Sequence, residues 1–314
     1  MIQISVVICT YNRARVLVKA LKSLVQQSLD KNLYEIIVVN NASMDNTSEV
    51  VQEFQVRHPE DNIILVRESH LGAGYARNTG IRNAKGNVVS FMDDDAQASR
   101  DWLELTHRCF EKVQPHSMGV GGRILPCYEA PKPKWFKDEY EIRTWGNGPR
   151  LLNPGEAFSG SNMAFRKAIL EKYGSFDTRV QISGNYLMIG EDTILFEKIW
   201  EHKGDAKFYY SPQLVVFHEV PLYKMTLSYQ LKRAFVTGQS WSLRHGTKSL
   251  AGQTIAILDA LVVLARLSFL ALFHIAEFSA FHHWVIERIR PIVIEIGRLV
   301  GCFGIIIPVR QRQR

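Results

Sequence analysis

Four short runs of β-branched and other apolar residues recur through the first 92 residues, and amphipathic stretches separate them. Continuous runs of this kind are typical of strands buried on both faces of a parallel sheet. The expected strands lie at residues 3–9, 35–40, 63–67 and 87–92, and the expected helices at 16–27, 47–57 and 74–84. This order predicts an α/β fold with a doubly wound, mostly parallel sheet, in which ligands bind at the carboxyl ends of the strands.

Length and composition are those of a folded protein of one large or two ordinary domains. The chain has 314 residues, 46% of them hydrophobic and 22% charged, which excludes collagen-like, low-complexity and wholly disordered classes. Its four cysteines lie far apart without a CxxC pair, so that neither a zinc site nor a disulfide framework is expected. The first residues lack the pattern of a secretory signal, and these features together favour the cytoplasm.

Positive charge is concentrated in the last third of the chain. Residues 222–314 hold 12 Lys and Arg against 4 Asp and Glu, a net charge of +8, whereas the whole chain carries +7. Such asymmetry indicates either an anionic partner, nucleic acid or a membrane surface, or a solvated basic face. We predict a catalytic domain over residues 1–221 and a basic helical region over residues 222–314.

The last third also contains two strongly apolar segments, at residues 250–278 and 292–309. Charged residues interrupt both segments, so no charge-free run approaches the about 20 residues that a membrane-spanning helix needs. On a helix, the charges of the first segment form one narrow stripe beside a broad apolar face: Lys248, Asp259, Arg266 and Glu277. Such amphipathic helices either pack on the first domain or lie in a membrane interface with basic residues toward anionic lipid, and we favour the membrane.

Between the two regions the sequence loses its regular pattern. Residues 123–154 are rich in Pro, Lys and aromatic residues, which predicts a long functional loop. In this loop, Trp135 and Trp145 could stack on acceptor sugar rings or anchor a folded lid. The chain then returns to regular elements, which we expect as helices at 166–173 and 191–202 and a strand at 206–210.

Three consecutive carboxylates, Asp93, Asp94 and Asp95, directly follow the fourth expected strand. Like charges this close raise one another's pKa and destabilise the fold unless a cation neutralises them. Carboxylate oxygens suit a hard divalent cation such as Mg²⁺ or Mn²⁺. Taken alone, the run is explained either by a metal site or by an acidic turn that caps a helix.

Polar turns follow the first two expected strands. They supply the following side chains: Thr10, Tyr11, Arg13, Asn40 and Asn41. Ordinary helix caps account for each turn separately, but the doubly wound topology would bring these turns and the acidic run to one crevice. A further segment at 72–78 offers two glycines and Arg77 to a diphosphate at a helix N-terminus, although the GKS/T ending of a P-loop is missing.

These segments, in this order, resemble the family 2 glycosyltransferases, which are nucleotide-sugar enzymes of the GT-A fold. The resemblance covers residues 3–220 and is carried by seven short motifs: VVICTYNR, VVNNASMDNT, GYARNTG, FMDDDA, GSNMAFRK, GEDTILFEKI and VVFHEV. It implies a nucleotide-sugar donor, with a UDP-sugar favoured, a glycan or lipid-linked acceptor, and Mn²⁺ or Mg²⁺ as cofactor. Nucleic acid is not an expected partner.

The same resemblance implies roles for individual residues. Nucleotide binding falls to Thr10, Tyr11, Arg13, Asn40, Asn41, Arg77, Asp93 and Asp94. Metal binding falls to Asp95, with Asp93 as a second candidate, and to His218, although a histidine at a strand end is more often a structural residue. The contacts to sugar or acceptor fall to Gly160, Ser161 and Asn162, although a polar turn before a helix also explains this segment. Trp145 is a further candidate for such contacts, from its aromatic chemistry rather than from the resemblance.

One position departs from the family pattern. Relatives usually carry Asp where this chain has Asn40, and that carboxylate accepts a hydrogen bond from the N3–H group of uracil. An amide oxygen can also accept this hydrogen bond, although without the strength of a charged acceptor. The identity of the base therefore stays open.

The acidic pair Glu191 and Asp192 opens an expected helix and matches the pair from which the family draws its catalytic base. A hydroxyl that attacks an anomeric carbon must lose its proton, so a carboxylate within hydrogen-bond reach is suited to the task. Carboxylates in a first helical turn also simply complement the helix dipole. Of the two residues we favour Asp192 as the base.

The resulting hypothesis is a metal-dependent inverting glycosyltransferase, associated peripherally with the cytoplasmic face of a membrane. A nucleotidyltransferase would share the α/β sheet and the acidic run, but it has no need of the acidic pair at 191–192. The alternative from another class is a non-catalytic scaffold that keeps the fold and binds membrane or partners through its basic region.

Overall fold

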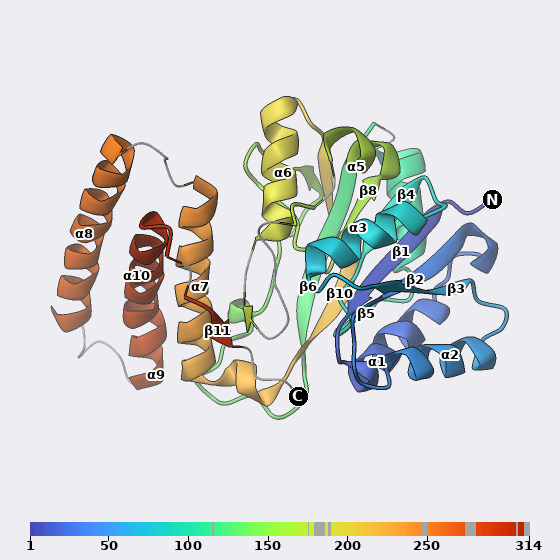
Figure 1. Ribbon diagram of the computed structural model, residues 1–314, viewed down its shortest axis with the longest axis horizontal. Helices are drawn as coiled ribbons and strands as arrows, with labels where there is room; N and C mark the ends of the chain where they lie inside the picture. Colours follow the sequence, from blue (N-terminus) through green and yellow to red (C-terminus); the bar gives the residue numbers. More distant parts are fainter. Residues whose placement is uncertain are drawn as a thin grey trace.

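A mostly parallel sheet forms the centre of the molecule, with strand order β3-β2-β1-β4-β8-β6-β10-β5 and with β7 paired to β10 (Figure 1). The computed structural model describes residues 1–114, 116–174, 176–178, 186–187, 190–245, 250–273, 281–305 and 307–310. The strands of this sheet are β1 (Ile4–Thr10), β2 (Tyr34–Asn41), β3 (Ile63–Glu68), β4 (Val88–Phe91), β5 (Ala96–Ala98), β6 (Gly119–Tyr128), β7 (Arg150–Leu151), β8 (Met163–Arg166) and β10 (Phe208–Val220).

Helices cover both faces of the sheet. One face carries α1 (Ala14–Val25), α2 (Thr47–Arg57) and α4 (Trp102–Arg108), and the other carries α3 (Ala73–Asn83), α5 (Lys167–Tyr173) and α6 (Glu191–His202). In Figure 1 the labelled helices α1 and α2 lie on the opposite side of the sheet from α3 and α5. Strand β1 shows why its sequence is continuously apolar: Val6 and Ile8 pack into the core of the first face, and Val7 packs into the core of the second. The predicted α/β class with a doubly wound, mostly parallel sheet is confirmed.

Two expected boundaries were wrong. The first part of the expected loop, Arg123 to Tyr128, belongs to β6, which pairs in parallel with β10 along its length. Pro126 is tolerated there because the second edge of β6 pairs with β8 only over Gly119 to Gly121 and with Arg143 only at Ile124, so no pairing that the structure describes along this edge needs an N–H group at Pro126. The strand expected at 206–210 is the beginning of the much longer β10.

Helices of the last third pack beside the sheet domain, at the left of Figure 1. They are the 3₁₀ turn η4 (Leu222–Met225), α7 (Leu227–His245), α8 (Leu250–Phe273), α9 (Phe281–Trp284), the π-helical turn η6 (Val285–Ile289) and α10 (Arg290–Cys302). A short strand β11 (Val309–Arg310) returns to pair with β9 (Tyr186–Leu187), just before α6. The division of the chain into domains at residue 221 stays a prediction.

The segment between β6 and β7 connects these helices to the sheet domain. Glu141 forms a 2.8 Å ion pair with Arg233 of α7. Trp135, which the sequence offered as a sugar platform or a lid anchor, stacks on His282 of α9 with ring centroids 5.1 Å apart. The irregular segment therefore acts as a packing layer between the sheet and the C-terminal helices.

Glycines allow α7 and α10 to approach closely. A Cβ atom on Gly238 of α7 would overlap the backbone carbonyl of Ile294, and one on Gly297 of α10 would overlap the carbonyl of Phe235. Gly301, one turn further along α10, lies against the Cβ atom of Ser242 and the backbone carbonyl of Gln239. Backbone rather than side chains forms this contact, so it cannot adjust to an added methyl group by a change of rotamer.

Gly238→Ala is therefore expected to lower the free energy of unfolding by about 1–3 kcal/mol, because the added methyl group forces the two helices apart. Chemical denaturation measures this change. Gly204→Ala is the matched control, since a Cβ atom there meets no atom within 4 Å. Equal stability of Gly238→Ala and the control would show that α7 and α10 do not hold this contact.

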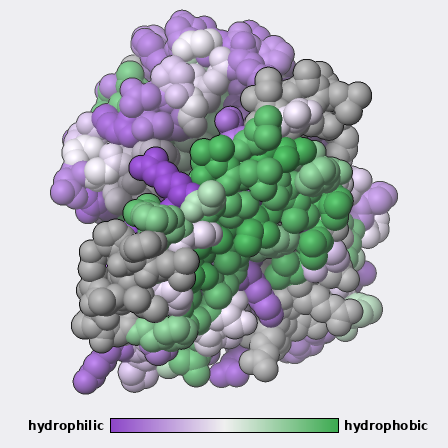
Figure 2. Space-filling view, turned by 90° about the vertical axis from the view of Figure 1, so that its left-hand side faces the viewer, coloured by the Kyte–Doolittle hydropathy of each residue, from purple (hydrophilic) through white to green (hydrophobic). Residues whose placement is uncertain are grey.

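The outer side of α8 is apolar and faces solvent. Ala260 and Ala271 pack inward, whereas the exposed side carries large apolar residues: Leu258, Leu261, Val262 and Phe269. Figure 2 shows a continuous hydrophobic area over this end of the molecule. Of the expected charged stripe, Asp259 and Arg266 are exposed; Lys248 and Glu277 lie outside the described residues. Across the described ranges, every helix falls short of the combined length and apolarity that a bilayer crossing requires.

Candidate active site

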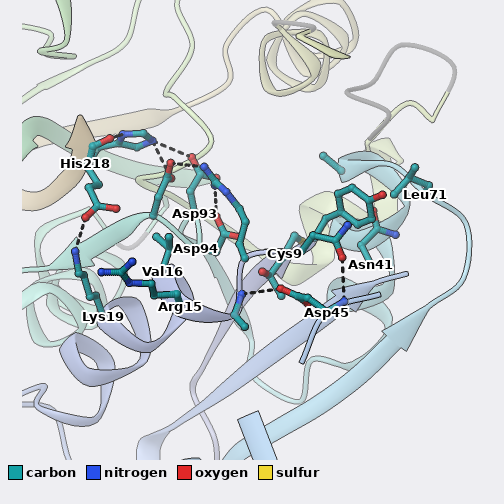
Figure 3. A pocket seen from close by; sticks show the side chains of 18 of the residues that line it. Cys9, Arg15, Val16, Lys19, Asn41, Asp45, Leu71, Asp93, Asp94 and His218 are labelled. Carbon is teal, nitrogen blue, oxygen red and sulfur yellow. Dashed lines mark hydrogen bonds and ion pairs between the residues drawn. The ribbon is translucent and has the colours of Figure 1, made fainter. Parts of the chain in front are cut away.

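A cavity of about 590 Å³ opens at the carboxyl ends of the central strands. Its wall is built from the turns after β1, β2 and β4, the start of α3, the end of β10 and the turn η4. Figure 3 shows this wall, with His218 and the acidic run at one end and Asn41 and Leu71 at the other. Ten of the residues singled out in the sequence line it: Thr10, Tyr11, Arg13, Asn41, Arg77, Asp93, Asp94, Asp95, Glu191 and His218.

Strand register brings the acidic run and His218 together. Strand β5 begins directly after Asp95, and its first residue, Ala96, pairs with His218 of β10. The Nε2 atom of His218 consequently lies 3.1 Å from Oδ1 of Asp95 and 3.8 Å from Oδ2 of Asp93. Ligand atoms of these three residues all lie within 4.8 Å of one another, so two carboxylates and one imidazole could hold a divalent cation here.

Cations surround the carboxylates. The guanidinium of Arg13 lies 2.5 Å from Asp94 and 3.1 Å from Asp95, and Nζ of Lys224 lies 3.7 Å from Asp95. Burial raises the pKa of Asp94 to about 6, in spite of Arg13. Burial acts in the same sense on Asp95, but His218, Arg13 and Lys224 together hold its pKa well below the usual range.

The turn after β1 is tied to the turn after β2. Asn12 adopts a left-handed conformation with φ 51°, and its side-chain oxygen accepts hydrogen bonds from the backbone N–H groups of Met44 and Asp45. The carboxylate of Asp45 in turn accepts a hydrogen bond from the N–H of Ala14, at the start of α1. Both turns therefore form one rigid edge of the cavity.

Asn40 and Asn41 use their amides inside the protein. Asn40 donates to the hydroxyl of Ser48 at 2.7 Å and accepts from the N–H of Ser43 at 2.9 Å. Asn41 donates to the carbonyl of His70 and accepts from the N–H of Gly72, at 2.7 Å in each case. These bonds position the turns that follow β2 and β3.

The two carboxylates that open α6 have different surroundings. Glu191 is buried and forms a very short ion pair with Arg77, which also lies 3.6 Å from Asp93. Burial raises the pKa of Glu191, although Arg77 opposes the shift. Asp192 is half-buried, and its two oxygens accept hydrogen bonds from the N–H groups of Gly160 and Thr193, at 2.7 and 2.9 Å.

Within the described part of the chain, seven residues singled out in the sequence lie outside the cavity wall: Asn40, Trp135, Trp145, Gly160, Ser161, Asn162 and Asp192. Gly160 packs against Arg77, which itself lines the cavity, and a Cβ atom on Gly160 would lie 2.8 Å from the guanidinium of Arg77. Asn162 is a structural cross-link that accepts from the indole of Trp102 and donates to the carbonyl of Leu214. Trp145 packs against the hydrophobic core instead.

The residues that line the cavity but had no role assigned from sequence include Asn12, Asp45, Tyr223 and Lys224. Asn12 stands inside the motif VVICTYNR and Asp45 inside VVNNASMDNT, and their polar side chains next to strand ends were an available signal. Tyr223 and Lys224 lie beyond residue 221, in a region expected to be separate from catalysis. Nothing in their local sequence pattern links them to the cavity.

A family model described as "Glycosyl transferase family 2" matches residues 5–174. The chain belongs to this family. It is 26% identical over 246 residues to the glucosyl-dolichyl phosphate glucuronosyltransferase of Haloferax volcanii, with 76% of each chain covered. It is 37% identical over 183 residues to glycosyltransferase AglE of the same organism, and spans 58% of that relative's length.

The folds of solved glycosyltransferase structures agree with this family membership. The mannosyltransferase PcManGT from Pyrobaculum calidifontis, in complex with GDP-Man and Mn²⁺, superposes with a TM-score of 0.62 at 21% identity, over 95% of this chain and 87% of its own. Residues 1–349 of S. aureus TarS, in complex with UDP, give 0.56 at 14% identity, over 96% of this chain and 92% of that one. The predicted GT-A fold and the predicted glycosyltransferase class are thus confirmed.

Proposed function

We propose that this glycosyltransferase moves a sugar, with inversion, from a nucleoside diphosphate to an acceptor hydroxyl, and that it depends on Mn²⁺ or Mg²⁺. The observation that carries this proposal is the cluster of Asp93, Asp95 and His218 in the wall of a cavity at the strand ends. Oxygen and imidazole ligands fit either cation. A structural neighbour of the same fold is itself in complex with GDP-Man and Mn²⁺, which supports the assignment.

In this proposal the cavity accommodates the donor along its length. The turns at Tyr11 and Leu71 would receive the nucleoside, and the cluster at Asp95 would face the diphosphate. The cation, when bound, neutralises charge that develops on the departing diphosphate. Arg13 keeps Asp94 and Asp95 in place, because it contacts both carboxylates.

Asp192 is our proposed general base. Each oxygen of its carboxylate accepts one backbone hydrogen bond, and each has a second lone pair for an acceptor hydroxyl. Glu191 is less suited because its carboxylate is committed to Arg77 in a buried pair. One base is sufficient for a single displacement, in which the acceptor attacks the face of the sugar opposite the leaving diphosphate.

For the substrates we propose a UDP-sugar as donor and a glycan or lipid-linked molecule as acceptor. TarS is in complex with UDP, whereas PcManGT is in complex with GDP-Man, so a test must include several bases. Two relatives are named for dolichyl phosphate-linked substrates, which supports a lipid-linked acceptor.

The decisive experiment incubates the purified protein with UDP-, GDP- and dTDP-sugars, with Mn²⁺, Mg²⁺ or EDTA, and measures the release of nucleoside diphosphate. We expect one base to be preferred and EDTA to abolish release. Release that persists in EDTA would contradict the metal dependence. Tight nucleotide binding without any transfer to a panel of glycan and lipid-linked acceptors would favour the alternative of a non-catalytic scaffold.

A second proposal concerns location: the protein lies peripherally on the cytoplasmic face of a membrane, with the outer side of α8 in the lipid interface. Leu258, Val262 and Phe269 form its apolar contact, and Val262 is 70% exposed. Burying each such side chain contributes about 1.5–3 kcal/mol. The net charge of +8 over residues 222–314 adds attraction to anionic headgroups, which favours a bilayer over a second copy of this basic region.

Flotation with vesicles of phosphatidylcholine and phosphatidylglycerol tests the location. We expect the protein to float at low salt, and we expect Val262→Asp combined with Phe269→Asp to reduce the bound fraction at least about tenfold. Val56→Asp is the matched control, because Val56 is 80% exposed on α2, far from this face in sequence. Failure to float, or a concentration-dependent dimer that the double variant abolishes, would contradict the membrane assignment.

A further inference from the structure

Lys224 is a buried lysine at the end of the cavity that holds His218. Lys224 is only 6% exposed, yet it lines the cavity wall. Among the residues that the structure describes, its ammonium group makes one long hydrogen bond, 3.4 Å to the carbonyl of Glu219, and one loose ion pair, 3.7 Å to Asp95. An ammonium group has three donors, and buried charges are normally fully paired, so this group has capacity for a further anionic partner.

The position of Lys224 is fixed from behind. The turn η4 closes with a bond from the N–H of Lys224 to the carbonyl of Pro221 at 2.9 Å, and Gln230 of α7 donates to the carbonyl of Lys224 at 2.9 Å. Met225, the next residue, is buried against Phe136. A lysine whose backbone is held on both sides presents its ammonium group at a defined place, which lowers the entropic cost of binding an anion.

Asp95 does not require Lys224 as its counter-ion. Arg13 and His218 each contact its carboxylate at 3.1 Å, closer than Lys224 does. Lys224 and His218 contact the same carboxylate, that of Asp95, and Figure 3 shows His218 at the opposite end of the cavity from Asn41 and Leu71, where the proposed donor places its nucleoside. The anion within its reach is therefore the phosphate farther from the nucleoside.

We infer that Lys224 binds the β-phosphate of the nucleoside diphosphate and stabilises it as the leaving group. In the transfer, the acceptor oxygen forms a bond to the anomeric carbon, the bond from that carbon to the β-phosphate oxygen breaks, and its electron pair stays on this oxygen. The acceptor proton passes to Asp192, and Lys224 donates a hydrogen bond to the charged oxygen. This inference rests on the proposed function and adds a catalytic residue supplied by the C-terminal region.

Calorimetry with UDP and UMP, or with the diphosphate and monophosphate of whichever base the protein prefers, isolates the contact in the presence of Mn²⁺. Lys224→Met keeps the apolar stem and removes the charge. We expect its affinity for the diphosphate to fall about 10- to 100-fold, as for loss of a charge-assisted hydrogen bond, and its affinity for the monophosphate to change less than about threefold. Lys224→Arg should recover part of the loss. Lys232→Met, an exposed lysine on α7, is the matched control.

The outcomes separate this inference from the proposed function. A wild-type protein that binds no nucleoside diphosphate would contradict the proposed function itself. The inference is overturned if the wild type binds normally but Lys224→Met loses affinity for the monophosphate and the diphosphate equally. Lys224 would then be a structural residue. If the methionine variant fails to fold, Lys224→Gln, which keeps a donor for the Glu219 carbonyl, replaces it and must show the same selective loss.

Discussion

Asp192→Asn is expected to reduce turnover by about 10²- to 10⁴-fold, because asparagine keeps the size of the side chain but cannot take up a proton. Donor binding should survive, since Asp192 is not among the residues that line the cavity. Single-turnover transfer and calorimetry with the donor measure the two quantities separately. A variant with near-normal turnover would rule out Asp192 as the base.

Glu201→Gln is the matched control for this experiment, because Glu201 is an exposed carboxylate on the same helix. Glu191→Gln makes a second comparison. It removes the closer of the two carboxylates that pair with buried Arg77 and leaves only Asp93 at 3.6 Å, so we expect a loss of stability as well as of activity. A base at Glu191 would instead show a loss of turnover in a variant that unfolds at the same denaturant concentration as the wild type.

Asp95→Ala is expected to weaken nucleotide binding in Mn²⁺ at least about 100-fold, because the change removes a first ligand of the proposed cation. From sequence alone, Asp95→Ala is expected to change the free energy of unfolding little, because it relieves repulsion within the acidic run. The structure instead predicts a lower free energy of unfolding, because His218 and Arg13 lose the carboxylate that both contact. Calorimetry with and without Mn²⁺ measures the first effect, and denaturation measures the second.

The stability effect has a defined pH dependence. The pKa of Asp95 is lowered in the folded chain, so its ion pairs stabilise the fold above the ordinary aspartate pKa of 3.8. That stabilisation is lost as the pH falls through the lowered value, and the difference between the variant and the wild type should disappear there. Asp205→Ala, at an exposed site, is the control. Unchanged nucleotide affinity in Mn²⁺ would remove Asp95 from the metal site.

The first half of the sheet could be predicted because each of its strands is a continuous apolar run with helices between them. Strand β10 was only partly predictable, since its register against β6 shifts between Ser211 and Val215. This irregularity accommodates Pro212 and Gln213, which interrupt the apolar pattern and conceal the continuation of the strand. The pattern of apolar residues therefore predicts regular strands, but it does not predict the full length of a strand that contains a bulge.

The site was predictable where topology alone decides it. Turns after parallel strands must meet at one sheet edge, and Thr10, Asn41 and Asp95 do meet there. What each side chain then does depends on hydrogen bonds within the turns, which the sequence does not encode in any simple pattern. Asn40 illustrates this, because its amide is already used by Ser43 and Ser48.

Because the turn η4 places Tyr223 and Lys224 in the cavity wall, the helices that follow it are not an exchangeable appendage. Replacing the C-terminal region by that of a relative at the apparent boundary, residue 221, would also exchange two residues of the cavity. A chimera that keeps the original wall must be joined after Met225, and it must preserve a partner such as Gln230 for the carbonyl of Lys224. The point at which the C-terminal region can be exchanged without changing the cavity therefore lies inside the helical region, not at residue 221.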